Sequence, residues 1–125
     1  MEFKIDTKPN FILWKPLYDT LDEKLTATLR DKWKEMAENN YHNLVLDFQL
    51  CLTSEEKAIE ELIEFHKAVY SSKHSLVCID LQSSLLKNIK IAGAELILNI
   101  APTQQEAVDI ISMEILEREL FDEEA

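Results

Sequence analysis

Residues 44–65, "LVLDFQLCLTSEEKAIEELIEF", join two stretches that have different hydrophobic periods. The first stretch is a continuous apolar run broken mainly by Asp47, and such a run predicts a strand that is buried on both faces of a sheet. The second stretch begins after Thr53-Ser54 and spaces its apolar side chains three and four residues apart, which predicts an amphipathic helix. A buried strand that leads directly into a helix is typical of α/β domains, in which helices connect parallel strands.

The rest of the chain alternates between strand and helix patterns in the same way. The patterns predict strands at residues 2–6, 10–16, 43–50, 75–81 and 94–100, and helices at residues 20–40, 54–70, 84–93 and 103–120. The expected order is β-β-α-β-α-β-α-β-α, with an opening antiparallel hairpin and right-handed crossovers later in the chain. The sequence therefore predicts a single α/β domain over residues 1–125 with a mixed, mainly parallel sheet and an acidic, frayed tail at about 121–125.

The composition is strongly acidic, with 24 Asp and Glu residues against 13 Lys and Arg residues and a formal net charge of −11. Such a surface repels phosphate backbones and anionic membranes, so we expect neither nucleic acid nor a membrane as a ligand. The acidic excess fits two interpretations: solubility alone, or a protein partner with a basic face. The apolar runs are too short for a membrane helix and the N-terminus has no apolar signal core, so we expect a cytoplasmic protein.

Few residues offer cofactor or metal chemistry. Gly93 is the single glycine of the chain, whereas loops that bind phosphate groups through their backbone need several glycines. Cys51 and Cys78 do not have the spacing of metal ligands, and we expect both to be buried, reduced thiols. The sequence therefore predicts no cofactor and no metal site.

The spacing of Thr53 and Glu56 has a structural interpretation, the capping box. The Thr hydroxyl accepts a hydrogen bond from a backbone N–H of the first turn, and the Glu side chain reaches back to the N–H of the cap residue. Thr20 and Thr103 are also followed by Glu three residues later, each where the pattern becomes helical. We therefore predict that these three Thr residues are the N-caps of three helices.

Three segments resemble the STAS domain family of bacterial anti-sigma factor antagonists. Residues 42–49, "HNLVLDFQ", resemble the third strand of that family, and residues 85–96, "LLKNIKIAGAEL", resemble the short helix before its last strand. Residues 101–111, "APTQQEAVDII", resemble its strand-to-helix turn near the C-terminus. Because the order of the predicted elements also matches, the resemblance covers nearly the whole chain and implies a STAS-like fold.

The same resemblance implies a regulatory serine. In the family, the segment after the third strand reads D-S-S-G or D-S-T-G, and a cognate anti-sigma kinase phosphorylates its second hydroxyl residue. Matched residue by residue, Leu52 stands at the Asp, Thr53 at the first hydroxyl, Ser54 at the phosphoacceptor and Glu55 at the Gly. Both flanking signature residues are absent, and Glu55 adds a negative charge beside the site. We therefore expect Ser54 to be a degenerate phosphoacceptor that is phosphorylated inefficiently.

The resemblance also implies a non-enzymatic regulator that binds an anti-sigma factor or a related switch kinase. The partner-binding candidates lie at the start of the helix after the third strand and on the adjacent short helix: Cys51, Leu52, Thr53, Ser54, Glu55, Glu56, Leu85, Leu86 and Lys87. Two alternatives from other classes remain. The chain is either a module that binds a small molecule or a nucleotide, or a structural subunit of a larger complex that docks through its last helix.

Other polar residues have structural interpretations. Asp47 ends a predicted strand, as the phosphorylated Asp of a receiver domain does, but the acidic pair that such a domain uses to hold Mg²⁺ is absent after the first strand. His42, His66 and His74 are not paired four residues apart with an acidic base, so we expect solvated or core histidines.

Overall fold

The computed structural model describes residues 1–38 and 43–124. The predicted end of the first helix at residues 39–40, and His42, lie outside the described residues. In chain order the elements are β1 (Phe3–Thr7), β2 (Ile12–Pro16), β3 (Thr20–Leu21), α1 (Glu23–Ala37), β4 (Leu44–Asp47), β5 (Thr53–Ser54), α2 (Glu56–Ser71), β6 (Leu76–Ile79), α3 (Ser83–Ile91), the 3-10 turn η1 (Ala94–Leu96), β7 (Ile100–Ala101) and α4 (Gln104–Glu124).

The main sheet has five strands in the order β1-β2-β4-β6-β7. β1 and β2 form an antiparallel hairpin, and every later neighbouring pair of strands is parallel. Helices connect the parallel strands, as a right-handed crossover requires. The predicted fold class, an α/β domain with a mixed and mainly parallel sheet, is confirmed.

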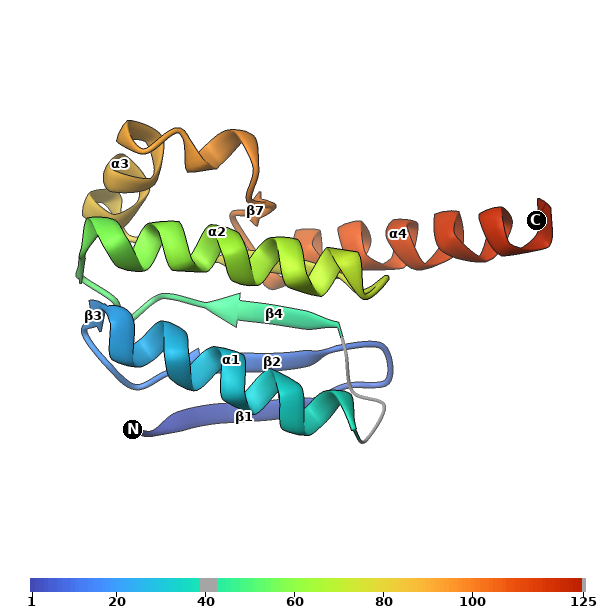
Figure 1. Ribbon diagram of the computed structural model, residues 1–125, viewed down its shortest axis with the longest axis horizontal. Helices are drawn as coiled ribbons and strands as arrows, with labels where there is room; N and C mark the ends of the chain where they lie inside the picture. Colours follow the sequence, from blue (N-terminus) through green and yellow to red (C-terminus); the bar gives the residue numbers. More distant parts are fainter. Residues whose placement is uncertain (39–42, 125) are drawn as a thin grey trace.

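The central strand β4 is buried on both faces, which explains its continuous apolar sequence. Leu44 and Leu46 belong to a core that includes side chains of α1 and α2, whereas Val45 belongs to a second core that includes Ala107 and Ile111 of α4. Alternate side chains of a strand point to opposite faces of its sheet, so helices cover both faces. α1 and α2 lie side by side across one face, and α4 lies behind the other and extends towards the C-terminus (Figure 1).

Two of the three predicted capping boxes are wrong. Thr20 and Thr53 lie in a small parallel ladder between β3 and β5, in which they pair with each other. The N-cap of α1 is Asp22, whose carboxylate accepts a hydrogen bond from the Leu25 N–H at 2.9 Å. The N-cap of α2 is Glu55, and its side chain makes no capping hydrogen bond.

The physical reason is that the backbone around β5 pairs with the segment before α1. The N–H groups of Leu52 and Thr53 donate to the Asp19 carbonyl, and the Glu55 N–H donates to the Leu21 carbonyl. These bonds hold Thr53 in an extended strand, so that α2 begins only at Glu56. The third box is confirmed for its Thr half, because the Thr103 hydroxyl accepts from the backbone N–H of the residue three positions later at 3.3 Å.

The last strand is shorter than the sequence predicts. Residues 94–100 were expected to be extended, but residues 94–96 form the 3-10 turn η1 and β7 is only Ile100–Ala101. Gly93 ends the preceding helix, as predicted, with a positive φ of 73° that glycine adopts readily. η1 then directs Ala94 and Leu98 into the core, so that only two residues remain to pair with β6.

Two further expectations concern the chain end and the thiols. α4 continues through Glu124, so the tail is helical where the sequence predicted fraying from about residue 121. Cys51 and Cys78 are free and buried, as predicted, and burial raises the pKa of both thiols to about 12. Across residues 1–38 and 43–124, none of the helices combines the length and the apolar character that a membrane crossing requires.

Candidate functional site

The turn between β4 and β5 positions the start of the candidate site. Asp47 is buried at the end of β4, and its carboxylate accepts a hydrogen bond from the Gln49 N–H at 2.9 Å. The Cys51 N–H donates to the Phe48 carbonyl at 3.0 Å, and the Cys51 thiol donates to the Tyr18 carbonyl at 3.3 Å. Because Cys51 points inward at this turn, the neighbouring Leu52 points outward and is 56% exposed.

Ser54 lies where β5 and α3 meet. Its side chain is half-buried, and its hydroxyl accepts a hydrogen bond from the side-chain amide of Asn88 at 2.8 Å. Ser84, one turn earlier on α3, donates its hydroxyl proton to the Leu52 carbonyl. Two side chains of α3 therefore fix the position of β5, and both are residues that the sequence did not single out. The one signal available was their spacing of four, which places them on the same side of a helix.

A shallow pocket opens beside the Ser54 hydroxyl. Its volume is about 340 Å³. It is lined by residues of β5, α2 and α3, namely Ser54, Glu56, Ile59, Asn88, Ile91 and Ala92. The pocket thus has an apolar wall with one carboxylate and two neutral polar groups, which suits a protein side chain better than a phosphate group.

Unpaired carboxylates surround the start of α2. Glu55 and Glu56 are exposed, and neither they nor Asp19 takes part in an ion pair within the described residues. The partial positive charge at a helix N-terminus stabilises such carboxylates by about 0.3–1 kcal/mol each. The region therefore carries a fixed negative charge that the domain itself does not neutralise.

The adjacent Tyr18 and Asp22 form a hydrogen-bonded pair. The Tyr18 hydroxyl donates to the Asp22 carboxylate at 2.6 Å, and this bond raises the pKa of the Tyr18 phenol. Burial acts to raise the pKa of Asp22, but the hydrogen bonds from Tyr18 and from the Leu25 N–H outweigh it, so the Asp22 pKa lies below its usual value. Asp22 is therefore a charged helix cap at neutral pH.

The structure separates the partner-binding candidates into two groups. Cys51 and Leu85 are fully buried and take part in the core. The other candidates reach the surface, with Ser54 and Leu86 half-buried and Leu52, Thr53, Glu55, Glu56 and Lys87 exposed. We call these seven surface residues the β5 surface.

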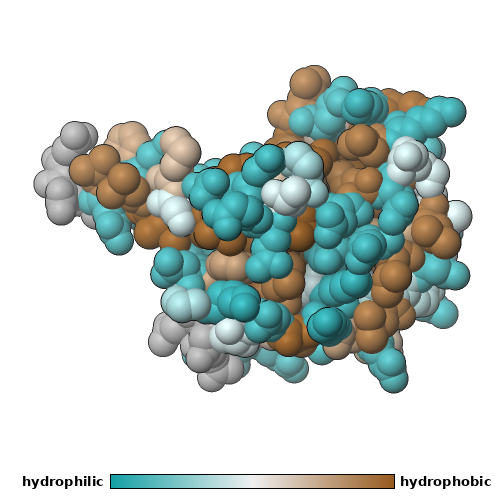
Figure 2. Space-filling view, turned by 180° about the vertical axis from the view of Figure 1, so that it is seen from behind, coloured by the Kyte–Doolittle hydropathy of each residue, from teal (hydrophilic) through white to brown (hydrophobic). Residues whose placement is uncertain are grey.

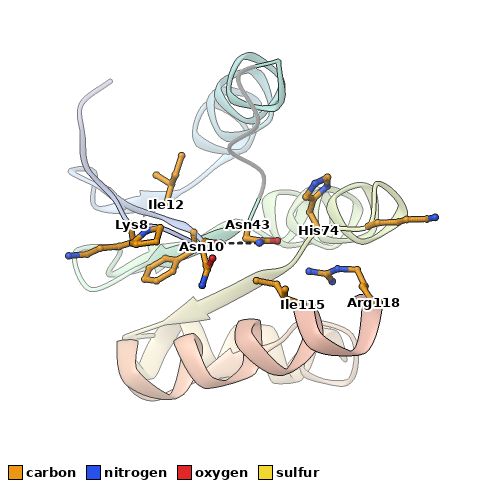
Figure 3. A pocket seen from close by; sticks show the side chains of 10 residues that line it. Lys8, Asn10, Ile12, Asn43, His74, Ile115 and Arg118 are labelled. Atoms are coloured by element: carbon orange, nitrogen blue, oxygen red, sulfur yellow. Dashed lines mark hydrogen bonds between the residues drawn. The ribbon is translucent and has the colours of Figure 1, made fainter. Parts of the chain in front are cut away.

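A second pocket lies at the opposite end of the parallel strands, before the first residues of β4 and β6 (Figure 3). Its volume is about 300 Å³, and none of its ten lining residues is Asp or Glu, whereas Lys8, Lys73, His74 and Arg118 are among them. The Arg118 guanidinium points inward and donates to the hydroxyl of the buried Ser75 at 3.0 Å. This is a basic cavity in an acidic protein.

Burial also shifts the pKa values of His66 and Asp80. His66 is buried on α2, as its place in the helical pattern predicted, and its ring lies 4.6 Å from that of Tyr70. Burial lowers the pKa of His66, although the nearby Glu114 opposes this shift. Burial and the charge of Asp47 raise the pKa of Asp80. No three His, Cys, Asp or Glu side chains in the described part of the chain are grouped to hold a metal ion.

Comparisons with known proteins find similarity to this chain in structure and not in sequence. The sequence matches no family model and no curated protein sequence. RsbS from Moorella thermoacetica, solved with a serine-to-glutamate substitution, is 16% identical over 94% of this chain and 99% of its own, with a TM-score of 0.72. An anti-sigma-factor antagonist (STAS) domain protein from Planctomyces limnophilus is 9% identical over 88% of this chain and 97% of its own, with a TM-score of 0.70.

The anti-sigma factor antagonist SpoIIAA of Bacillus is also similar. Its unphosphorylated form is 12% identical over 89% of this chain and 96% of its own, with a TM-score of 0.69. At such identities the similarity is one of fold. The chain has the fold of the STAS domain, as the resemblance of its sequence implied.

Proposed function

We propose that this protein is a non-enzymatic, cytoplasmic regulatory domain that binds a protein partner through the β5 surface. The partner is of the class that anti-sigma factor antagonists bind, an anti-sigma factor or a related switch kinase. The observation that carries the proposal is the exposure of Leu52 beside the unpaired carboxylates of Glu55 and Glu56, in a fold that solved anti-sigma factor antagonists share. An exposed apolar side chain flanked by charges suits a protein interface.

Phosphorylation of Ser54 is not the main control of this surface. The Ser54 hydroxyl accepts from Asn88 in a half-buried contact, and a phosphate there would add about −1.5 to −2 charges beside Glu55 and Glu56. SpoIIAA has been solved in phosphorylated and unphosphorylated forms. In this chain Glu55 and Glu56 are permanently charged. A phosphate on Ser54 would therefore change the local electrostatic potential by a smaller fraction than it would at a site without these carboxylates.

The permanent charge determines what the partner must present. A basic face is attracted to the β5 surface at long range, and this attraction weakens as salt shortens the screening length from about 10 Å at 0.1 M to about 3 Å at 1 M. Leu52 adds apolar contact that salt does not screen. We therefore expect an association that is strong at low salt and retains a residual affinity at high salt.

The test uses the partner recovered by affinity purification and then purified. Its affinity is measured for the wild type, for Glu55→Gln/Glu56→Gln, and for the matched control Asp31→Asn/Glu38→Gln, which removes the same charge from two exposed residues in α1 and at its C-cap. The first double variant should lose affinity and much of the salt dependence, whereas the control should lose little of either. Equal affinities and equal salt dependence in all three proteins would exclude the β5 surface as the interface.

The basic cavity favours a second candidate function, the binding of a small anion. Arg118 has no carboxylate partner among residues 1–36, 38 and 43–121, and its guanidinium fork suits a carboxylate or phosphate group. Thermal denaturation with inorganic phosphate and with a nucleotide tests this function, since a bound ligand raises the melting temperature. Stabilisation that is lost in Arg118→Gln would support it, and unchanged melting at millimolar ligand would exclude it.

A further inference from the structure

The last helix is longer than its contact with the sheet. α4 has 21 residues, which correspond to about 30 Å at about 1.5 Å per residue. Its buried side chains, Ala107 and Ile111, are in its first half, and Ile115 is partly buried against the same core. The second half extends beyond the body of the domain (Figure 1).

The outward side of α4 carries an apolar stripe. Met113, Leu116 and Leu120 are 63%, 56% and 51% exposed. At about 100° per residue they lie on the side of the helix opposite to Ile111 and Ile115, which pack on the sheet. Hydrophobic residues gather on this projecting part of the molecule (Figure 2).

The spacing of the stripe is that of a helix-packing seam. Intervals of three and then four residues are those of the a and d positions of a coiled coil, which pack into holes on a facing helix. Phe121, the residue after the last member of the stripe, is 71% exposed and widens the apolar area. Contiguous exposed apolar side chains on a small domain mark an interaction site. The stripe therefore fits one helix of another molecule.

The charges beside the stripe decide which molecule this is. Glu117 and Glu119 flank it and have no ion-pair partner in the described part of the chain, and the helix sequence holds eight acidic residues against the single basic residue Arg118. A second copy of α4 would place carboxylates against carboxylates, and an anionic membrane would be repelled for the same reason. A helix with basic residues beside its apolar seam is complementary to the apolar stripe and to the carboxylates that flank it.

We propose that Met113, Leu116 and Leu120 form a docking surface for a basic amphipathic helix of a partner protein. This surface does not overlap the β5 surface, because α4 covers the face of the sheet opposite to α1 and α2. The domain thus offers two separate binding surfaces, and the inference does not depend on the function proposed for the first one. If the chain is instead a structural subunit that docks through its last helix, the inference specifies what that helix binds, namely a basic amphipathic helix.

The experiment uses the full chain and two synthetic helical peptides. Both peptides carry leucines at every a and d position, and the flanking positions are lysines in one and glutamates in the other. Fluorescence anisotropy should show that the lysine peptide binds at least about tenfold more tightly, since each factor of ten corresponds to about 1.4 kcal/mol. Leu116→Ser/Leu120→Ser should lose this binding, whereas the control Leu96→Ser/Ile97→Ser, at two exposed residues in and after η1, should keep it.

Several outcomes would overturn the proposal. Equal binding of the two peptides would remove the charge argument, and equal binding by the two double variants would place the peptide elsewhere. Sedimentation equilibrium of the protein alone gives a further check. A dimer that Leu116→Ser/Leu120→Ser dissociates would make the second copy the occupant, and co-sedimentation with anionic phosphatidylserine vesicles that the same variant abolishes would make it a membrane.

Discussion

Ser54→Ala is expected to destabilise the protein more than Thr53→Ala. The Ser54 hydroxyl accepts from the Asn88 amide at 2.8 Å in a half-buried contact, and its removal leaves the amide without this partner. A hydrogen bond of this kind contributes about 0.5–1.5 kcal/mol net, and partial access of water places the expected loss near 1 kcal/mol. The Thr53 hydroxyl is exposed and bonds to that of Thr20 at 3.1 Å, a cross-strand pair at the low end of about 0.2–1 kcal/mol.

The measurement is urea denaturation followed by far-UV circular dichroism. Four proteins complete a double-mutant cycle: the wild type, Ser54→Ala, Asn88→Ala and the double variant. The coupling free energy between the two positions should be about 0.5–1 kcal/mol, and the denaturant dependence should not change, because each substitution removes few atoms. Thr53→Ala is measured under the same conditions as the comparison.

The opposite order would refute the structural assignment. An N-cap Thr contributes about 0.5–2 kcal/mol, whereas the first helical residue contributes little through its hydroxyl. If Thr53→Ala costs about 1 kcal/mol more than Ser54→Ala, and the coupling to Asn88 is near zero, then Thr53 caps α2 and the pairing of β3 with β5 does not form in solution.

Three further predictions concern modification and pH. Incubation with the cognate kinase and ATP should leave most of the protein at its unmodified intact mass, and rapid stoichiometric phosphorylation at Ser54 would contradict this. Cys51 and Cys78, whose thiol pKa values are raised to about 12 by burial, should react with a thiol reagent at pH 8 only in denaturant. Burial lowers the pKa of His66, so the folded protein favours the neutral imidazole. This contribution to the free energy of unfolding is fully present above the unfolded pKa of about 6.5, and it is lost as the pH falls towards the lower pKa of the folded state. Denaturation between pH 5 and 8 should therefore show a steeper acid loss for the wild type than for His66→Gln, and parallel profiles would exclude this role.

Local sequence patterns correctly predicted the elements whose side chains are buried in a regular, periodic way. The run at β4 is apolar at every position that faces either core, and α2 repeats its apolar residues with the period of a helix. Gly93 marked the end of α3 because the chain needs a positive φ there. These signals depend on residues that are close in sequence.

The features that the sequence missed depend on residues far apart in the chain. Thr20 and Thr53 are separated by 33 positions, and a two-residue ladder has no period that a pattern can reveal. The spacing from Thr to Glu is the same whether the Thr caps a helix or pairs in a strand. The hydrogen bond from Asn88 to Ser54 is likewise nonlocal, so the sequence singled out Ser54 as a candidate but not its hydrogen-bond partner on α3.

The two proposed surfaces share one electrostatic constraint. The β5 surface presents Leu52 beside Glu55 and Glu56, and α4 presents its apolar stripe beside Glu117 and Glu119. Burying such carboxylates in an interface without a cation is costly, because removing a charge from water is repaid only by a hydrogen-bonded partner. A protein that covers either surface must therefore bring Lys or Arg, and the same requirement disfavours nucleic acid and acidic proteins. The apolar residues supply the part of the affinity that persists at 1 M salt, so the ratio of affinities at low and high salt separates the two contributions at each surface.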